Sequence, residues 1–129
     1  KKNADLLNLK HRASFKLGNW CENIEGKFDL IVSNPPYISE YEMMNLSKDV
    51  LNWEPRIALT PEGDGLEAYK YILNGAKKLL KPNGKLILEI GYNQRDDVSY
   101  LLKSNNYKDI TVIKDINNKD RIISASWFD

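Results

Sequence analysis

Residues 34–37 form an Asn-Pro-Pro-Tyr tetrad that ends an apolar run beginning at Phe28. The side-chain oxygen of Asn34 and the backbone carbonyl of Pro35 can each accept one N–H from a planar nitrogen group. Two such acceptors fix the orientation of a weakly nucleophilic nitrogen and direct its lone pair toward an incoming methyl group. The tetrad therefore predicts a methyl-transfer site in which Asn34, Pro35 and Tyr37 are catalytic.

Rigidity is the reason for prolines at this site. A proline ring fixes φ at about −65°, and Pro36 also pushes Pro35 into an extended conformation. Tyr37 supplies a flat wall for a planar group, so all four residues, Asn34, Pro35, Pro36 and Tyr37, are expected to bind the substrate. The alternative is an ordinary strand end, because Asn and Pro are common loop residues. Open α/β sheets bind ligands at the carboxyl ends of their strands, which favours the site.

The tetrad and its flanks resemble the PrmC/HemK family of protein-glutamine N5-methyltransferases. The residues that carry this resemblance outside the tetrad are Ile38, Asp49-Val50, Trp53-Glu54-Pro55, Ala58-Leu59, Asp64-Gly65, Leu88-Glu89, Gly91 and Gln94. The resemblance implies S-adenosylmethionine as methyl donor. It also implies a peptide chain release factor as partner, methylated on the glutamine of its Gly-Gly-Gln loop.

The resemblance further implies that Asn19, Trp20 and Asn34 contact the cofactor. The family usually has an acidic residue where this chain has Asn19. The Asn19 carbonyl can still accept from the adenine amino group, but a neutral acceptor makes a weaker hydrogen bond than a carboxylate. Trp20 fits either as a wall for the adenine or as a core residue.

A glycine-rich turn between an early strand and a helix, which holds the cofactor's amino-acid end in such enzymes, is not found in the sequence. The chain starts at Lys1 in what reads as the middle of a helical segment. We therefore expect residues 1–129 to be the C-terminal part of a methyltransferase catalytic domain whose N-terminal cofactor-binding part is absent, and to be inactive alone.

The composition indicates one soluble globular domain. Nineteen basic and 18 acidic side chains give a net charge of +1, too small a field to attract a polyanion strongly, so nucleic acid is not expected as the direct substrate. The single cysteine, Cys21, suits the cytoplasm. The sequence contains no long apolar stretch for a membrane span and no metal-ligand spacing, and His11 lies in a polar context.

Periodicity predicts an α/β fold, a partial class I S-adenosylmethionine-dependent methyltransferase sheet of Rossmann-like type, mostly parallel with an antiparallel C-terminal hairpin. A long irregular segment, 39–61, is expected to be either an acceptor-side wall or a surface excursion. The sequence predicts helices over 1–9, 62–80 and 93–105, and strands over 13–17, 28–33, 85–90, 110–115 and 121–128.

Some residues and functions stay open at this stage. Asp29 reads as a solvated strand start, and Glu89 lies either near the cleft or in a cap or ion pair. Two alternatives to release factor methylation also remain. One is an amino-methyltransferase acting on adenine or cytosine, which must flip its base out. The other is a non-catalytic binding module.

Overall fold

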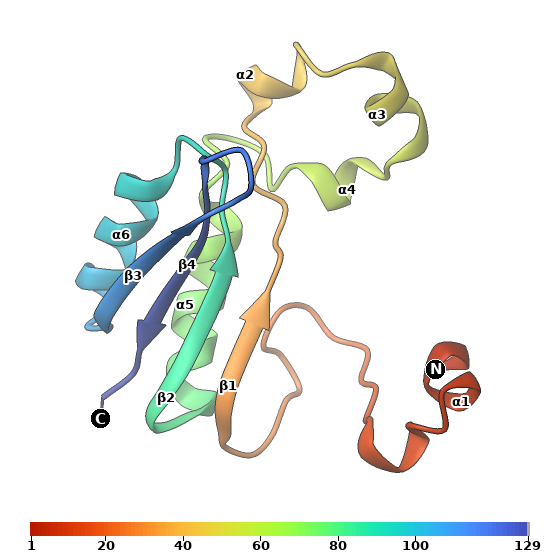
Figure 1. Cartoon of the computed structure of the whole chain (residues 1–129), viewed down its shortest axis with the longest axis vertical. Helices are drawn as coiled ribbons and strands as arrows, with labels where there is room; N and C mark the ends of the chain where they lie inside the picture. The colour runs from red at the N-terminus through yellow and green to blue at the C-terminus, as the bar shows by residue number, and fades with distance from the viewer. Residues whose placement is uncertain (129) are drawn as a thin grey trace.

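The computed structural model describes residues 1–128 and contains a four-stranded sheet in the order β1-β2-β4-β3 (Figure 1). The α/β class is confirmed. In chain order the elements are α1 (Lys2–Leu6), the 3₁₀ helix η1 (Lys10–Arg12), β1 (Phe28–Ser33), α2 (Glu40–Met43), α3 (Lys48–Trp53), α4 (Arg56–Leu59), α5 (Glu67–Leu79), β2 (Leu80–Glu89), α6 (Arg95–Ser104), β3 (Lys108–Lys114) and β4 (Asp120–Ser126).

The sheet combines one parallel pairing with an antiparallel hairpin. β1 runs parallel to β2, with Val32 opposite Ile87. β4 lies antiparallel to both β2 and β3, and the predicted C-terminal hairpin is confirmed. Its turn is closed by Asp115, whose carboxylate accepts hydrogen bonds from the backbone of Asn117 and Lys119. The carboxyl ends of β1 and β2 therefore lie side by side, as a ligand site of this fold class requires.

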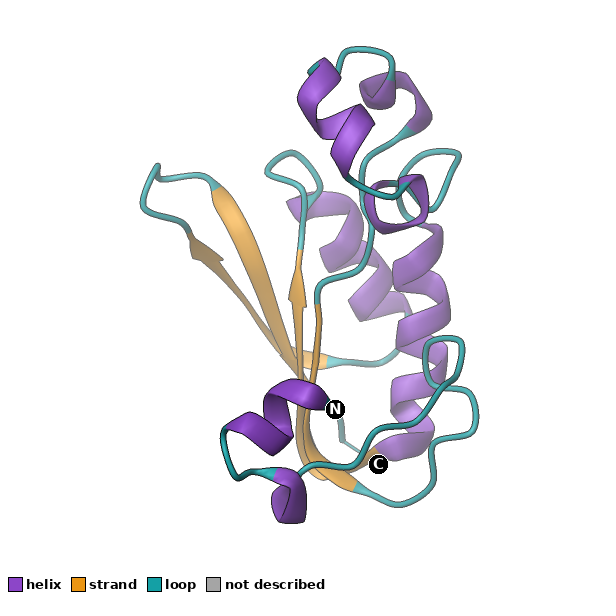
Figure 2. Ribbon diagram, turned by 90° about the vertical axis from the view of Figure 1, so that its right-hand side faces the viewer, coloured by secondary structure: helices purple, strands orange, loops and turns teal. Residues whose placement is uncertain are grey.

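The core lies between the sheet and the helices α5 and α6, which cover the same face of it (Figure 2). Alternate side chains of β2 and β4 point into this layer because side chains on a strand alternate between its faces. The core residues below 2% exposure include Tyr69, Leu73, Leu86, Leu88, Ile90, Val98, Leu102 and Ile123.

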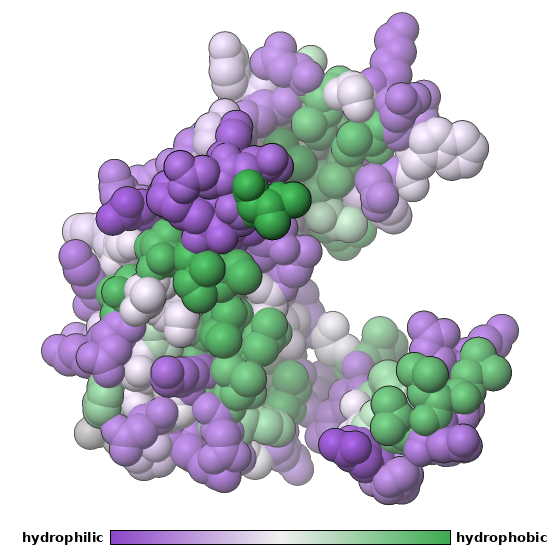
Figure 3. Space-filling model, viewed as in Figure 1, coloured by the Kyte–Doolittle hydropathy of each residue, from purple (hydrophilic) through white to green (hydrophobic). Residues whose placement is uncertain are grey.

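The other face of the sheet is open and apolar. Leu30 is 50% exposed and Val32 is 65% exposed. A band of apolar residues crosses the sheet on the face turned away from α5 and α6 (Figure 3). An uninterrupted apolar strand is typical of a sheet covered on both faces. Among the described residues only one of these faces is covered by helices.

Two predicted elements differ from the structure. Residues 13–17 form no strand, because nothing in residues 1–128 pairs with their backbone, and Leu17 is 98% exposed. The predicted helix 62–80 begins only at Glu67, because Glu62, Gly63 and Gly65 have φ of 71°, 60° and 82°, which a right-handed helix excludes. Those residues form the turn that the Gly-Asp-Gly sequence indicates.

Smaller differences concern the ends of other elements. α1 stops at Leu6, since Asn8 adopts a φ of 54°. β2 begins at Leu80 rather than at Lys85, because Leu80 already pairs with Phe28. Within residues 1–128, every helix is too short or too polar to cross a membrane.

The segment between Tyr37 and Thr60 forms an arm of three short helices, α2, α3 and α4, that projects beyond the sheet (Figure 1). Its base is closed by a hydrogen bond from Ile38 N to Leu59 O. Ser39 caps α2 in a capping box with Glu42. Trp53 and Ile57 are each 84% exposed, so these apolar side chains do not pack back on the sheet.

Candidate functional site

The Asn-Pro-Pro-Tyr tetrad leaves the carboxyl end of β1 directly after Ser33, which pairs with Leu88 of β2. Asn34 is exposed, whereas Pro35 is buried and Pro36 and Tyr37 are half-buried. The carboxamide of Asn34 is therefore accessible to a ligand. The buried ring of Pro35 holds the backbone rigid behind it.

A cavity of about 510 Å³ adjoins the tetrad. Pro36 lines it together with Asn19 and Trp20, the two residues expected to contact the cofactor. Arg56 and Ile57 of α4 form another part of its wall. Asn34 is not among its lining residues. The structure thus brings Asn19, Trp20 and Pro36 to one cavity and leaves the Asn34 side chain outside its wall.

Trp20 has both of the environments considered for it. Its ring packs against the core cluster and also lines the cavity beside Pro36. Its backbone adopts a φ of 53°, which is uncommon for a bulky residue. This conformation belongs to a turn in which Glu22 N donates to Asn19 O. The turn places Asn19 and Trp20 on the same cavity wall.

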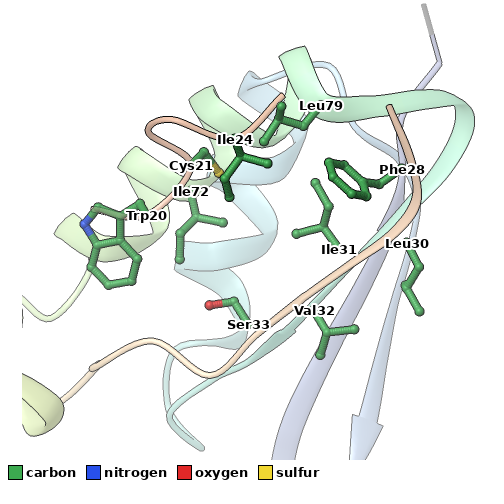
Figure 4. Close-up of a pocket in the computed structure, with 10 residues that line it drawn as sticks. All are labelled: Trp20, Cys21, Ile24, Phe28, Leu30, Ile31, Val32, Ser33, Ile72 and Leu79. Carbon is green, nitrogen blue, oxygen red and sulfur yellow. The ribbon is translucent and has the colours of Figure 1, made fainter. Parts of the chain in front are cut away.

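A second cavity, of about 310 Å³, opens beside β1 and is lined by apolar side chains (Figure 4). Phe28, Ile31, Ile24 and Leu79 contribute to it, and its other end reaches Trp20. Cys21 also lines it, and burial raises the pKa of the Cys21 thiol. A neutral thiol is a poor nucleophile. We therefore treat this cavity as a hydrophobic flank of β1 and not as a reactive site.

Tyr37 is fixed at its hydroxyl. The hydroxyl donates to Glu89 Oε1 at 3.0 Å and accepts from Arg121 Nη1 at 3.2 Å. Burial raises the pKa of Tyr37, and its hydrogen bond to Glu89 acts in the same direction. The phenol is therefore neutral near pH 7, and its hydroxyl is held by Glu89 and Arg121.

Tyr37 is also fixed at its backbone carbonyl, which accepts a hydrogen bond from Gln94 Nε2 at 2.9 Å. Gln94 is 5% exposed and lies directly before α6. Its side chain also contacts the backbone of Gly65 and Gly91. Three turns at the carboxyl edge of the sheet, containing Tyr37, Gly65 and Gly91, are thus joined by one buried amide.

The sequence does not reveal the roles of three residues that contact Tyr37. In the sequence, Gln94 stands only as part of the family-like pattern, the role of Glu89 stays open between two possibilities, and nothing distinguishes Arg121. The signal in the sequence is that Glu89 lies near the end of the predicted buried strand 85–90, and that Gly91 and Gln94 follow this strand. The expected surface positions of Asp29 and His11 agree with the structure, in which both are exposed.

Comparison with known proteins decides the family. The model of the family described as Eco57I restriction-modification methylase matches residues 1–117. This chain belongs to that methylase family. The likeness to release factor glutamine methyltransferases, inferred above from the motifs, is confirmed as well.

Curated relatives match most of the chain. A "Release factor glutamine methyltransferase" of Cereibacter sphaeroides is 42% identical over 95% of the chain and 44% of its own length. Another, from Fusobacterium nucleatum, is 52% identical over 77% of the chain and 28% of its own length. A "Bifunctional methyltransferase" of Rickettsia felis is 46% identical over 96% of the chain. The chain spans 24% of that protein, so it covers less than half the length of these relatives.

Solved structures show the same fold at low sequence identity. A putative rRNA methylase from Clostridium thermocellum has a TM-score of 0.63 at 16% identity and covers 97% of this chain and 66% of its own. A methyltransferase from Pyrococcus furiosus has a TM-score of 0.56 at 19% identity, and the match covers 82% of this chain and 44% of that protein. These similarities establish the methyltransferase fold and say nothing of the substrate.

Proposed function

We propose that the intact protein carrying this chain transfers a methyl group from S-adenosylmethionine to the glutamine amide nitrogen of the Gly-Gly-Gln motif in peptide chain release factors. Such an activity belongs to translation termination in the cytoplasm. Relatives with that name share 42% and 52% of their aligned residues with the chain. The observation that carries the proposal is the exposed carboxamide of Asn34 in a rigid tetrad, beside a cavity lined by Asn19, Trp20 and Pro36.

The residues of the tetrad act by orientation. Asn34 Oδ1 and the Pro35 carbonyl each accept one N–H of the substrate amide, which turns its lone pair toward the methyl donor. Tyr37 supports the flat face of the amide. Removal of a proton from the methylated nitrogen needs no strong base, because the cationic nitrogen formed by methylation is strongly acidic. Tyr37, with its raised pKa, and the exposed His11 accordingly have no place as bases.

The residues present fit one part of the cofactor. S-adenosylmethionine supplies an electrophilic methyl group when bound. The Asn19 carboxamide and the Trp20 ring line one cavity with Pro36, which suits the hydrogen-bonding edge and flat face of an adenine. We assign the adenine end of the cofactor to this cavity.

The second candidate is methylation of an exocyclic amine of adenine or cytosine in nucleic acid. It is favoured by the matching family model, which is described as a restriction-modification methylase. The same acceptor arrangement suits any planar amine, so the tetrad does not separate the two substrates. The net charge of +1 argues against it, because binding to a phosphate backbone is dominated by basic side chains.

A methyl-transfer assay on the intact protein separates these functions. Release factor, a release factor in which the Gly-Gly-Gln glutamine is replaced by glutamate, and duplex DNA are offered in parallel with radiolabelled S-adenosylmethionine. We expect label only in the unaltered release factor. Label in the DNA alone would establish the second candidate. Label in neither, with tight cofactor binding, would indicate a non-catalytic binding module.

A further inference from the structure

Tyr37 is held at both ends by side chains from three distant segments. Gln94 binds its carbonyl, while Glu89 and Arg121 bind its hydroxyl, and these partners lie 57, 52 and 84 residues away along the chain. We infer that these three residues, here named the Tyr37 clamp, are positioning residues for methyl transfer. They fix Tyr37 and thereby the acceptor oxygens of Asn34 and Pro35. This inference rests on the proposed function.

At the carbonyl end of the clamp, hydrogen bonds allow only one orientation of the Gln94 side-chain amide. Gln94 Nε2 faces two carbonyls, those of Tyr37 at 2.9 Å and Gly65 at 3.4 Å. Gln94 Oε1 faces two donors, Gly91 N at 3.0 Å and the Tyr69 hydroxyl at 3.2 Å. If the amide were flipped, its oxygen would face the Tyr37 carbonyl oxygen and its NH₂ group would face the Gly91 N–H. Because both ends of the amide are used, Gln94 acts on the tetrad and not on a ligand.

The hydrogen bonds at the carbonyl end of the clamp require glycine at two neighbouring positions, Gly65 and Gly91. A Cβ on Gly65 would lie 2.5 Å from Tyr37 O and 3.0 Å from Gln94 Nε2. A Cβ on Gly91 would lie 2.9 Å from Gln94 Oε1. Atoms this close to a Cβ must shift. The turns containing Gly65 and Gly91 therefore approach the Gln94 amide and the Tyr37 carbonyl more closely than a residue with a Cβ allows.

The hydroxyl end is anchored by charges of opposite sign. Arg121 also donates to Ile90 O at 3.3 Å and to Asp115 Oδ2 at 3.4 Å, so its guanidinium has little freedom. The Glu89 carboxylate accepts the hydrogen bond that the same phenol donates. For Tyr37 to leave its position, three hydrogen bonds have to break at once.

Holding Tyr37 fixes the reactive part of the tetrad between two anchors. On one side, Ser33 is paired with Leu88 in the sheet. On the other side is the Tyr37 clamp. Between them Pro35 and Pro36 remove two freely varying φ angles. Displacement of an oriented group by about 1 Å can cost on the order of 100-fold in rate, so the clamp is expected to control kcat.

Gln94→Glu in the intact protein is the sharpest test of the carbonyl end. The new side chain has the same shape and can still accept from Gly91 and Tyr69, but its second oxygen opposes the Tyr37 carbonyl. We expect kcat to fall by about 10- to 100-fold while the Kd for S-adenosylmethionine stays within about twofold. Activity relative to wild type should recover as the pH falls, because the protonated carboxyl can donate to Tyr37 O.

Tyr69→Phe is the matched control. It removes the hydrogen bonds that the buried Tyr69 hydroxyl offers to Gln94 Oε1 and to the backbone carbonyl of Glu89, and it leaves the bond from Gln94 to Tyr37 in place. We expect kcat within about twofold of wild type, even if the variant is less stable. Equal losses of kcat in both variants, or a wild-type kcat in folded Gln94→Glu, would overturn the inference.

Amide hydrogen exchange of residues 37–40 gives a readout that needs no methyl transfer. It should be faster in Gln94→Glu and unchanged in Tyr69→Phe. If wild-type protein methylates no release factor, the proposed function fails, and exchange still decides whether Gln94 holds the tetrad. If Gln94→Glu does not fold, Arg121→Met tests the hydroxyl end by the same two measurements. Unchanged exchange and kcat in that variant would also overturn the inference.

Discussion

Gly65→Ala is the substitution whose cost can be worked out most fully from the structure. Gly65 has a φ of 82°, and a left-handed conformation costs an L-residue roughly 1–2 kcal/mol. In addition, the new Cβ would lie 2.5 Å from Tyr37 O, and overpacking of this kind costs about 1–3 kcal/mol. The free energy of unfolding should therefore fall by about 2–5 kcal/mol.

Gly63→Ala, in the same turn, separates the two contributions. Gly63 has a φ of 60°, but a Cβ there would meet nothing within 4 Å. Only the backbone cost of about 1–2 kcal/mol should remain. Urea unfolding of the three proteins, followed by circular dichroism, measures both values. Equal losses of unfolding free energy in the two variants would show that Gly65 does not pack closely against Tyr37, and the inferred role of the Tyr37 clamp would be wrong.

Two further predictions concern the cavity proposed for the cofactor and the buried tyrosines. Asn19→Asp should tighten S-adenosylmethionine binding to the intact protein, because a charged acceptor makes a stronger hydrogen bond. Asn23→Asp adds the same charge to the same loop and should leave the affinity unchanged. Calorimetry measures both affinities, and equal effects would show that Asn19 does not contact the cofactor. Burial raises the pKa values of Tyr37, Tyr69 and Tyr107, so the unfolded chain ionises first and stability should fall as the pH rises above about 10. Urea midpoints between pH 8 and 11 check this, and Tyr107→Phe should give a shallower decline.

The sequence predicts those parts of the fold that local pattern determines. The apolar run ending at Asn34 is β1, and the polar turn after Asp115 joins a hairpin, since strand periodicity and turn residues are local signals. The expected strand at residues 13–17 fails for a different reason. A strand is completed by a neighbour, and no local pattern shows whether that neighbour is present.

The candidate site likewise has a part that local sequence predicts and a part that it does not. The tetrad is predicted as a site from residue types alone, because the proposed chemistry needs a side-chain amide next to rigid backbone carbonyls. The contacts of Gln94, Glu89 and Arg121 with Tyr37 could not be predicted, because each partner lies more than 50 residues away along the chain and meets Tyr37 only in the folded chain. A buried glutamine also has no sequence signature of its own, since glutamine is mostly exposed.

The central claim is that the carboxamide of Asn34 orients the nitrogen that receives the methyl group. Asn34→Ala in the intact protein tests it most directly, with Asn117→Ala, an exposed asparagine in the hairpin turn, as control. Loss of one preorganised acceptor should cost about 2–4 kcal/mol, or roughly 30- to 900-fold in kcat with release factor, while cofactor binding weakens only in part. The Asn117 variant should turn over like wild type. Wild-type turnover in Asn34→Ala would contradict the account.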